Sequence, residues 1–120
     1  MGKLHNKGYG FMKQYVMGIV TSGSTSDIGI SDTDRNTTQY FNIAYVTNNS
    51  AEDIEIILDG NTERKIVCLN GTAVEVTGSR FRNIQIKNLD GVTDTSADEI
   101  KITIQKEFSR LEEVELTEVY

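Results

Sequence analysis

The residues whose side chains could carry out catalysis are few in this chain. It contains one histidine, His5, and one cysteine, Cys68. General acid–base catalysis usually needs a group that titrates near neutral pH, and nucleophilic triads need a histidine beside the nucleophile. His5 lies in a glycine- and lysine-rich stretch that would do little to hold its ring in place. We therefore expect that the protein is not an enzyme and has no catalytic residues.

Metal-binding residues are scarce as well. A structural zinc site needs several cysteine or histidine ligands, and the chain has two such residues in total. The sequence Asp-Thr-Asp-Arg-Asn, which begins at Asp32, matches the opening of an EF-hand loop, but Thr37 replaces the required glycine and Ile43 the bidentate glutamate. An irregular oxygen-rich site that uses Asp27, Asp32 and Asp34 stays open, although turn-type hydrogen bonding is favoured for these residues. We expect no metal and no cofactor.

The other groups with chemical potential have simpler interpretations. The carboxylate pairs Glu52-Asp53, Asp98-Glu99 and Glu112-Glu113 lie at expected strand ends or in a tail, where charges are normally solvated. Cys68 lies in the apolar run 66–69, as expected for a small buried hydrophobic residue. The glycine-rich sequences that bind nucleotides are absent.

Charge and length narrow the range of partners. The net charge is -6 and the sequence pI is about 4.7, so the surface should repel nucleic acid and anionic membranes. The apolar cluster at 15–20 is too short to cross a bilayer, and the first residues lack the apolar stretch of a signal peptide. With 120 residues, the chain fits one domain. We expect it to be made in a cytoplasm.

Short strands must position whatever site the protein has. From residue 40 onward apolar and polar residues alternate, which is typical of half-buried strands. Turn sequences such as Asp59-Gly60 and Asn70-Gly71 separate the strands and predict hairpins that join the middle strands into a meander. The pattern predicts an all-β, antiparallel β-sandwich, either immunoglobulin-like or jelly-roll-like. The apolar sets are Phe41, Ile43 and Tyr45; Ile54, Ile56 and Leu58; Ile66 to Leu69; Val74 and Val76; Ile84 and Ile86; and Ile100, Ile102 and Ile104.

The chain divides into four parts around this expected core at 40–106. Residues 1–20 are interpreted either as an apolar N-terminal arm or as a first strand at 14–20. Residues 21–39 are a polar loop with one short strand inside it. Residues 107–120 form an acidic C-terminal arm whose alternating end could pair with a sheet edge.

The arms supply the residues that we expect to contact partner molecules. Aromatic and aliphatic side chains beside glycines suit a segment that lies on another surface better than an isolated helix. The predicted interface residues are Tyr9, Phe11, Tyr15 and Val16 in the first arm, and Leu116, Val119 and Tyr120 in the second.

Residues 43–88 have a recognisable order of strands and turns. An asparagine-rich turn precedes the apolar–acidic strand Ile-Glu-Ile-Ile-Leu, which is followed by Asp-Gly, Gly-Thr and Ile-Gln-Ile-Lys. This order resembles the small β-sandwich accessory proteins of tailed bacteriophages, such as head decoration, head-fibre base, neck and tail proteins. The resemblance covers less than half of the chain and implies a virion structural protein, made in the host cytoplasm, that contacts copies of itself and major capsid or neck and tail proteins.

Two other classes of function remain open. A carbohydrate- or surface-binding module would need an exposed aromatic patch, for which the chain offers tyrosine and phenylalanine but no tryptophan. A small enzyme would need a cleft with converging carboxylates. The candidates for the aromatic patch are Tyr9, Phe11, Tyr15, Tyr40 and Tyr45.

Overall fold

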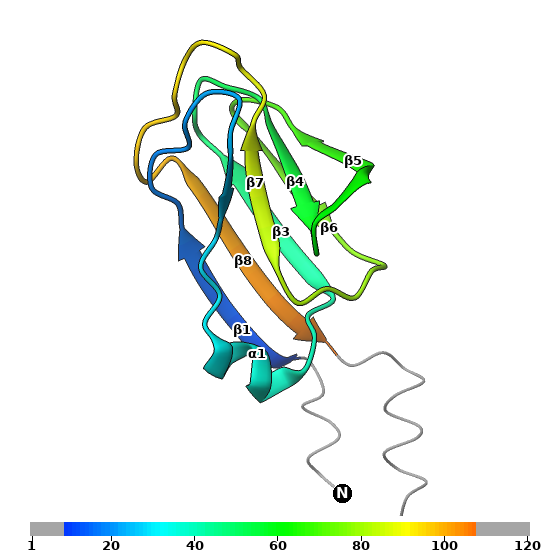
Figure 1. Cartoon of the computed structure of the whole chain (residues 1–120). Helices are drawn as coiled ribbons and strands as arrows, with labels where there is room; N and C mark the ends of the chain where they lie inside the picture. The colour runs from blue at the N-terminus through cyan, green and yellow to red at the C-terminus, as the bar shows by residue number, and fades with distance from the viewer. Residues whose placement is uncertain (1–8, 108–120) are drawn as a thin grey trace, which may run out of the picture.

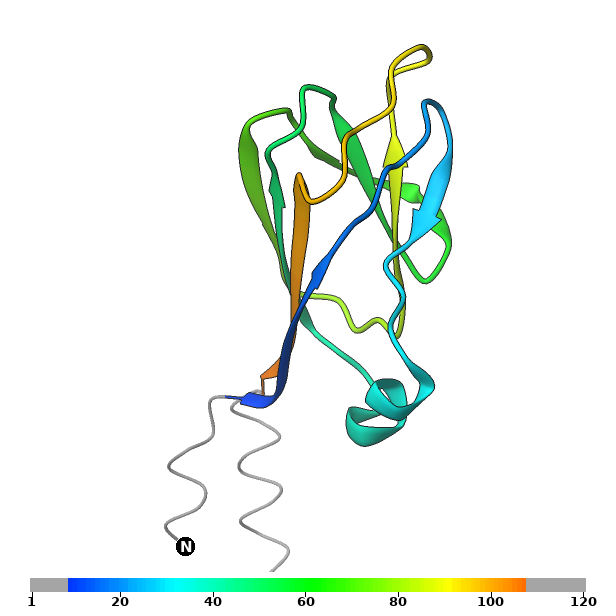
Figure 2. The same ribbon diagram turned by 90° about the vertical axis from the view of Figure 1, so that its left-hand side faces the viewer.

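The computed structural model describes residues 9–107, which form eight strands and one short helix (Figure 1). Two four-stranded sheets pack face to face, and the helix lies below them at one end (Figure 2). The predicted all-β sandwich is therefore confirmed. The elements are β1 (Tyr9–Val16), β2 (Thr25–Asp27), α1 (Asp32–Thr38), β3 (Ile43–Asn48), β4 (Ile54–Leu58), β5 (Asn61–Cys68), β6 (Thr72–Val76), β7 (Ile84–Asn88) and β8 (Ile100–Glu107).

The order of the strands identifies the topology. One sheet, called sheet A below, has the order β1-β8-β3-β6, and the other, sheet B, has the order β2-β7-β4-β5. All neighbouring strands are antiparallel. The first strand thus pairs with the eighth, the second with the seventh, the third with the sixth and the fourth with the fifth. A long hairpin of eight strands rolled into two sheets has this order, which is the jelly roll.

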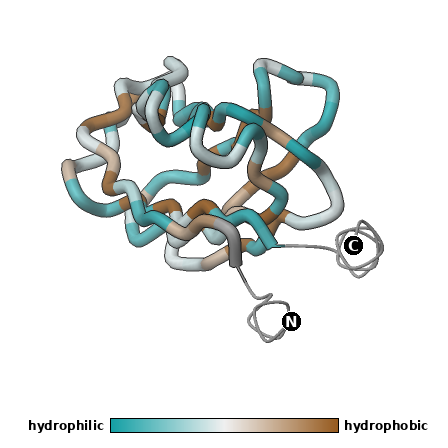
Figure 3. The backbone as a smooth tube through the Cα atoms, turned by 90° about the horizontal axis from the view of Figure 1, so that it is seen from below, coloured by the Kyte–Doolittle hydropathy of each residue, from teal (hydrophilic) through white to brown (hydrophobic). Residues whose placement is uncertain are grey.

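The core follows from the alternation along the strands. Ile100, Ile102 and Ile104 of β8 face sheet B and are almost fully buried, as their spacing predicts. Ile54 and Ile56 of β4 face them from the opposite sheet. Seen from below, hydrophobic and hydrophilic residues alternate along parts of the backbone (Figure 3). Two apolar inner faces therefore hold the sandwich together.

One predicted hairpin is wrong. Asn70-Gly71 does turn the chain, with Gly71 at a φ of 70°, but β5 pairs with β4 in sheet B and β6 pairs with β3 in sheet A. The turn therefore carries the chain from one sheet to the other, so the middle strands are not a meander. The Asp59-Gly60 turn does close a hairpin, between β4 and β5.

The expected alternation at the start of β3 is also wrong. Phe41 points into the core, as predicted, but Ala44 and Val46 are the buried residues of β3, whereas Tyr45 is 40% exposed. The alternation changes phase because β3 begins at Ile43, after Phe41 has formed a separate bridge with Phe81. A shift of one residue moves a side chain to the other face of a sheet.

The N-terminal third contains more regular structure than the sequence suggested. The first strand begins at Tyr9, not at residue 14, and residues 21–39 contain helix α1 in addition to β2. The side chain of Ser31 caps α1 by accepting a hydrogen bond from the Asp34 amide at 3.1 Å. Asp32 and Asp34 lie in its first turn, where they interact favourably with the helix dipole.

Candidate functional site

The first candidate site is the corner at which the described chain begins and ends. Tyr9 of β1 and Glu107 of β8 are register partners in sheet A, so the two ends of the described chain lie side by side (Figure 1). Helix α1 adjoins this corner, because the Lys106 ammonium donates a hydrogen bond to the Thr38 carbonyl at 3.2 Å. The predicted interface residues Leu116, Val119 and Tyr120, together with His5, lie outside the described residues.

Phe11 takes part in the protein's own packing. Its ring centroid lies 5.4 Å from that of Phe41 in a tilted arrangement, and the side chain packs against the core. Val16 is 48% exposed and Met12 is 54% exposed. Met12 and Val16 are therefore available to contact a partner, whereas Phe11 stabilises the sandwich.

Tyr15 is also used within the chain. Its hydroxyl donates a hydrogen bond to Asp34 Oδ2 at 2.9 Å, and the Lys13 ammonium donates to the same oxygen at 2.8 Å. These bonds tie α1 to β1. The lysine and tyrosine bonds lower the pKa of Asp34. Burial, followed by the hydrogen bond to Asp34 and its negative charge, raises the pKa of Tyr15 to about 12.

The raised pKa of Tyr15 predicts a loss of stability in alkali. A group whose pKa is higher in the folded state than the usual value of 10.0 stabilises the fold below pH 10 and loses that contribution as the pH rises toward 12. We expect Tyr15→Phe to flatten the fall in urea midpoint between pH 10 and pH 12. The exposed Tyr45→Phe is the matched control and should leave the fall unchanged. An identical fall in wild type and Tyr15→Phe would contradict the assignment.

A partly apolar surface extends from the corner across the outer face of sheet A. The register places Met12 of β1, Gln105 of β8 and Ile43 of β3 in one row across this face. Gln105 is only 5% exposed, and its Oε1 has no hydrogen-bond partner among the described residues. Tyr45 and Val16 add exposed apolar area on the same face. We call Met12, Val16, Ile43, Tyr45 and Gln105 the sheet A patch.

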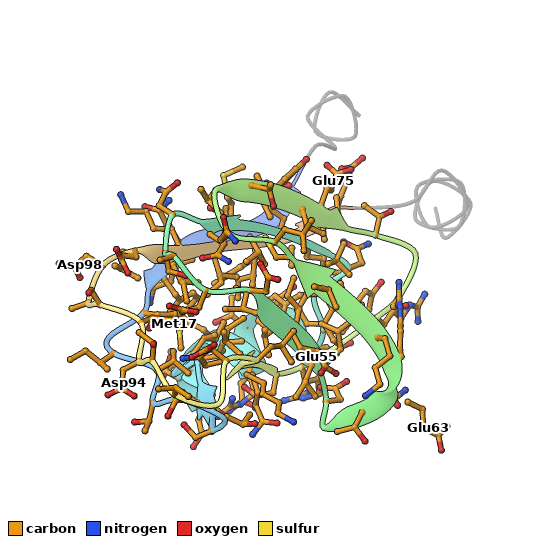
Figure 4. The ribbon with its side chains drawn as sticks, turned by 90° about the horizontal axis from the view of Figure 1, so that it is seen from above. Met17, Glu55, Glu63, Glu75, Asp94 and Asp98 are labelled. Carbon is orange, nitrogen blue, oxygen red and sulfur yellow. The ribbon has the colours of Figure 1, made fainter. Side chains whose placement is uncertain are left out.

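The opposite end of the sandwich is acidic. The loops 49–53 and 89–99 contain acidic residues, and neither these loops nor the adjoining loops 17–24 and 69–71 contain lysine or arginine. Seen from this end, Asp94 and Asp98 lie at the rim, whereas Met17 lies farther in (Figure 4). Such an end should repel polyanions. Its acidic residues are Glu52, Asp53, Asp90, Asp94, Asp98 and Glu99.

Several of these carboxylates serve the loops themselves. Asp90 accepts hydrogen bonds from the amides of Val92 and Thr93 at 3.0 and 2.5 Å, and these bonds lower its pKa. Asp53 accepts a bond from the Asn70 amide at 2.9 Å. Turn-type hydrogen bonding, which was favoured for Asp27, Asp32 and Asp34, thus also occurs at this end.

The candidate ligands of an irregular metal site do not converge. Asp27 accepts from the Gly29 amide and the Asn83 side chain, Asp32 pairs with Arg35, and Asp34 is held by β1. No group of three or more metal-ligating side chains occurs in residues 9–107. Cys68 is buried, as expected, and burial raises the pKa of its thiol. Across the same residues, no helix has the length and apolar content needed to span a membrane.

The aromatic patch needed by a sugar-binding platform does not form in the described part of the chain. Phe11 packs on Phe41, Tyr15 is tied to Asp34, and Tyr40 carries Arg80 and Lys106 on its ring. Tyr45 alone among the described candidate side chains is well exposed.

Sequence reasoning missed Gln105, Met12 and the outward direction of Ile43. Only the register of β8 between β1 and β3 reveals them. The one available signal was the amide at 105 at the end of the isoleucine alternation. Comparisons with known proteins add nothing to this picture: no family model matches the chain, and no curated protein shows significant similarity to it.

Proposed function

We propose that the protein is a non-enzymatic structural protein of a tailed-phage virion, an accessory or decoration protein that assembles through its terminal segments. One observation carries the proposal. The eight strands within 9–107 complete the jelly roll, so 21 further residues at the two ends are not needed to close it. Tyr9 and Glu107, to which these two segments are joined, are neighbours in sheet A, so both segments are attached at one corner of the sandwich.

The composition of the C-terminal segment supports this role. Six of the 13 residues in 108–120 are apolar: Phe108, Leu111, Val114, Leu116, Val119 and Tyr120. Apolar area of this kind is usually covered by another surface.

The sheet A patch supports the same role. It starts beside the corner at Met12, and Met12 and Ile43 flank Gln105 in one row of the register. Met12, Val16 and Tyr45 expose apolar area on this face that a neighbouring molecule could cover. Jelly rolls serve as capsid and lectin domains, which is an analogy of fold and not of function.

The test is the mass of the full chain and of two truncations, measured by light scattering after gel filtration. We expect the full chain, whose mass is 13.4 kDa, to form a defined oligomer. Removal of 108–120 should give a folded monomer with the mass of the shortened chain. The N-terminal truncation must stop at residue 8, because removing residues 1–12 would also remove half of β1. Removal of 1–8 should weaken assembly and leave the circular dichroism unchanged.

The matched control is Val92→Ala in the acidic end, at a side chain that is 87% exposed and far from the corner. It should leave the mass unchanged. A full chain that is monomeric at high concentration and also fails to bind purified phage heads or tails would overturn the proposal.

A further inference from the structure

A second site lies between the β4–β5 turn and the loop 77–83. There the surface contains a pocket of about 220 Å³. Its volume is below the range of pockets that enclose drug-sized ligands, so it suits a single small ring or group. The lining residues are Leu58, Asp59, Asn61, Arg64, Ile66, Ser79 and Arg80.

An irregularity in β5 brings Arg64 to this pocket. Ile56 pairs with Ile66, but the next pair along is Leu58 with Asn61, so the register shifts between them. Bulges of this kind redirect side chains and are frequent beside functional sites. The Arg64 guanidinium donates a hydrogen bond to Ser79 Oγ, which holds it against the loop 77–83. Glu63, the preceding residue, projects outward at the edge of the molecule (Figure 4).

Arg80 reaches the pocket from the other wall. Its guanidinium carbon lies 4.4 Å from the centroid of the Tyr40 ring, a distance typical of cation–π stacking. The Lys106 ammonium lies 4.2 Å from the same centroid. Stacking limits the freedom of the Arg80 side chain, so binding a ligand through it costs less conformational entropy.

The charge of the pocket differs from that of the whole chain. Asp59 is the one carboxylate in the lining, and its Oδ1 accepts hydrogen bonds from the backbone amides of Arg82 and Asn83, both at 2.8 Å. Arg64 and Arg80 bring two formal positive charges to the lining and Asp59 brings one negative charge, so the formal net charge of the lining is +1, whereas that of the chain is -6. A basic pocket on an acidic protein selects for anions locally.

We propose that this pocket binds the carboxylate of an acidic sugar unit. Planar guanidinium groups match the geometry of a carboxylate and can bind it through paired hydrogen bonds. The amide of Asn61 and the hydroxyl of Ser79 supply hydrogen-bonding groups for ring hydroxyls. Leu58 and Ile66 supply apolar area for the C–H face of the ring. The inference goes beyond the assembly role, because it gives the protein a small-molecule ligand in addition to a protein partner.

The test is titration of the full chain with trigalacturonate and with sialyllactose, followed by calorimetry. The matched ligands without a free carboxylate are the methyl ester of trigalacturonate and lactose. We expect at least one acidic sugar to bind and its uncharged counterpart to bind at least tenfold more weakly. Arg64→Gln and Arg80→Gln should each weaken binding about tenfold or more.

The control variant is Arg35→Gln, which removes a guanidinium from α1, where it pairs with Asp32. It should bind the sugar as the wild type does. Circular dichroism and the oligomer mass should stay unchanged in both pocket variants, so the result is separate from that of the assembly test.

Three results would overturn the pocket assignment. The first is the absence of binding by both acidic sugars at millimolar concentration. The second is equal binding by the uncharged counterparts or by the Arg64→Gln and Arg80→Gln variants. The third is binding of a peptide of residues 108–120 at Arg64 and Arg80 that sugars do not displace. The pocket would then be a receptor for the chain's own acidic segment.

Discussion

Replacing Phe41 by alanine is expected to lower the free energy of unfolding by about 3–5 kcal/mol. The side chain is fully buried, and its ring centroid lies 5.8 Å from that of Phe81 and 5.4 Å from that of Phe11. Phe41 and Phe81 also exchange two backbone hydrogen bonds, of 2.8 and 2.9 Å. Phe41 precedes β3 of sheet A and Phe81 precedes β7 of sheet B, so this pair joins the two sheets. Urea denaturation followed by circular dichroism gives the change.

Two controls separate the loss of packing from a general effect of substitution. Phe41→Leu keeps most of the apolar volume and should cost less than Phe41→Ala. Val92→Ala changes a side chain that is 87% exposed and should stay within about 0.5 kcal/mol of wild type. A loss below 1 kcal/mol for Phe41→Ala would mean that the Phe41–Phe81 bridge does not hold the sheets together.

The strands were predictable wherever alternation is strict and the phase is set by several apolar residues. Ile100, Ile102 and Ile104 allow only one orientation of the strand, because a shift of one residue in its register would expose all three side chains. The set Phe41, Ile43 and Tyr45 looks equally regular in sequence. It fails because Phe41 belongs to the bridge with Phe81, not to β3, and no local pattern encodes that long-range contact.

The connections between strands were less predictable than the strands. Asp59-Gly60 and Asn70-Gly71 look alike in sequence, since each is a short polar residue followed by a glycine, and both glycines have a positive φ. One closes a hairpin within sheet B and the other crosses to sheet A. The choice depends on which face each strand must bury against the other sheet, and this is a property of the whole core.

The sites were least predictable of all. Arg64 and Arg80 share no motif in the sequence, and they meet only because β5 changes register and the loop 77–83 lies across from it. Gln105 becomes part of a surface patch only through its neighbours in β1 and β3. By contrast, the scarcity of histidine and cysteine, with one residue of each, was readable directly from composition.

Asn48 is the residue whose side chain does most to connect the strand ends at the acidic end. Its amide donates to the carbonyls of Glu52 and Cys68 at 2.8 and 3.1 Å. Its oxygen accepts from the amide and the hydroxyl of Ser50 at 3.0 and 2.6 Å. Asn48 ends β3 in sheet A and Cys68 ends β5 in sheet B, so one buried side chain spans both sheets and orders the loop between β3 and β4.

Asn48→Ala is therefore expected to cost about 3 kcal/mol, because it leaves buried backbone groups without partners. The neighbouring Asn49→Ala is the matched control: its side chain is exposed, and its backbone amide keeps the 2.8 Å bond to Glu99. Denaturation in urea compares the two. A loss for Asn48→Ala no larger than that for Asn49→Ala would show that the hydrogen bonds of Asn48 are replaced by water without cost.

Asn88 offers an independent check of the same argument in the other sheet. It ends β7, is fully buried, and donates to the carbonyls of Val20 and Thr93 at 3.1 and 2.8 Å. Asn48 and Asn88 share no hydrogen-bond partner, so the losses of the two alanine variants should add within about 0.5 kcal/mol in the double variant. A larger deviation would mean that the two loop systems at the acidic end fold as one cooperative unit, and that the β3–β4 and β7–β8 connections stabilise each other.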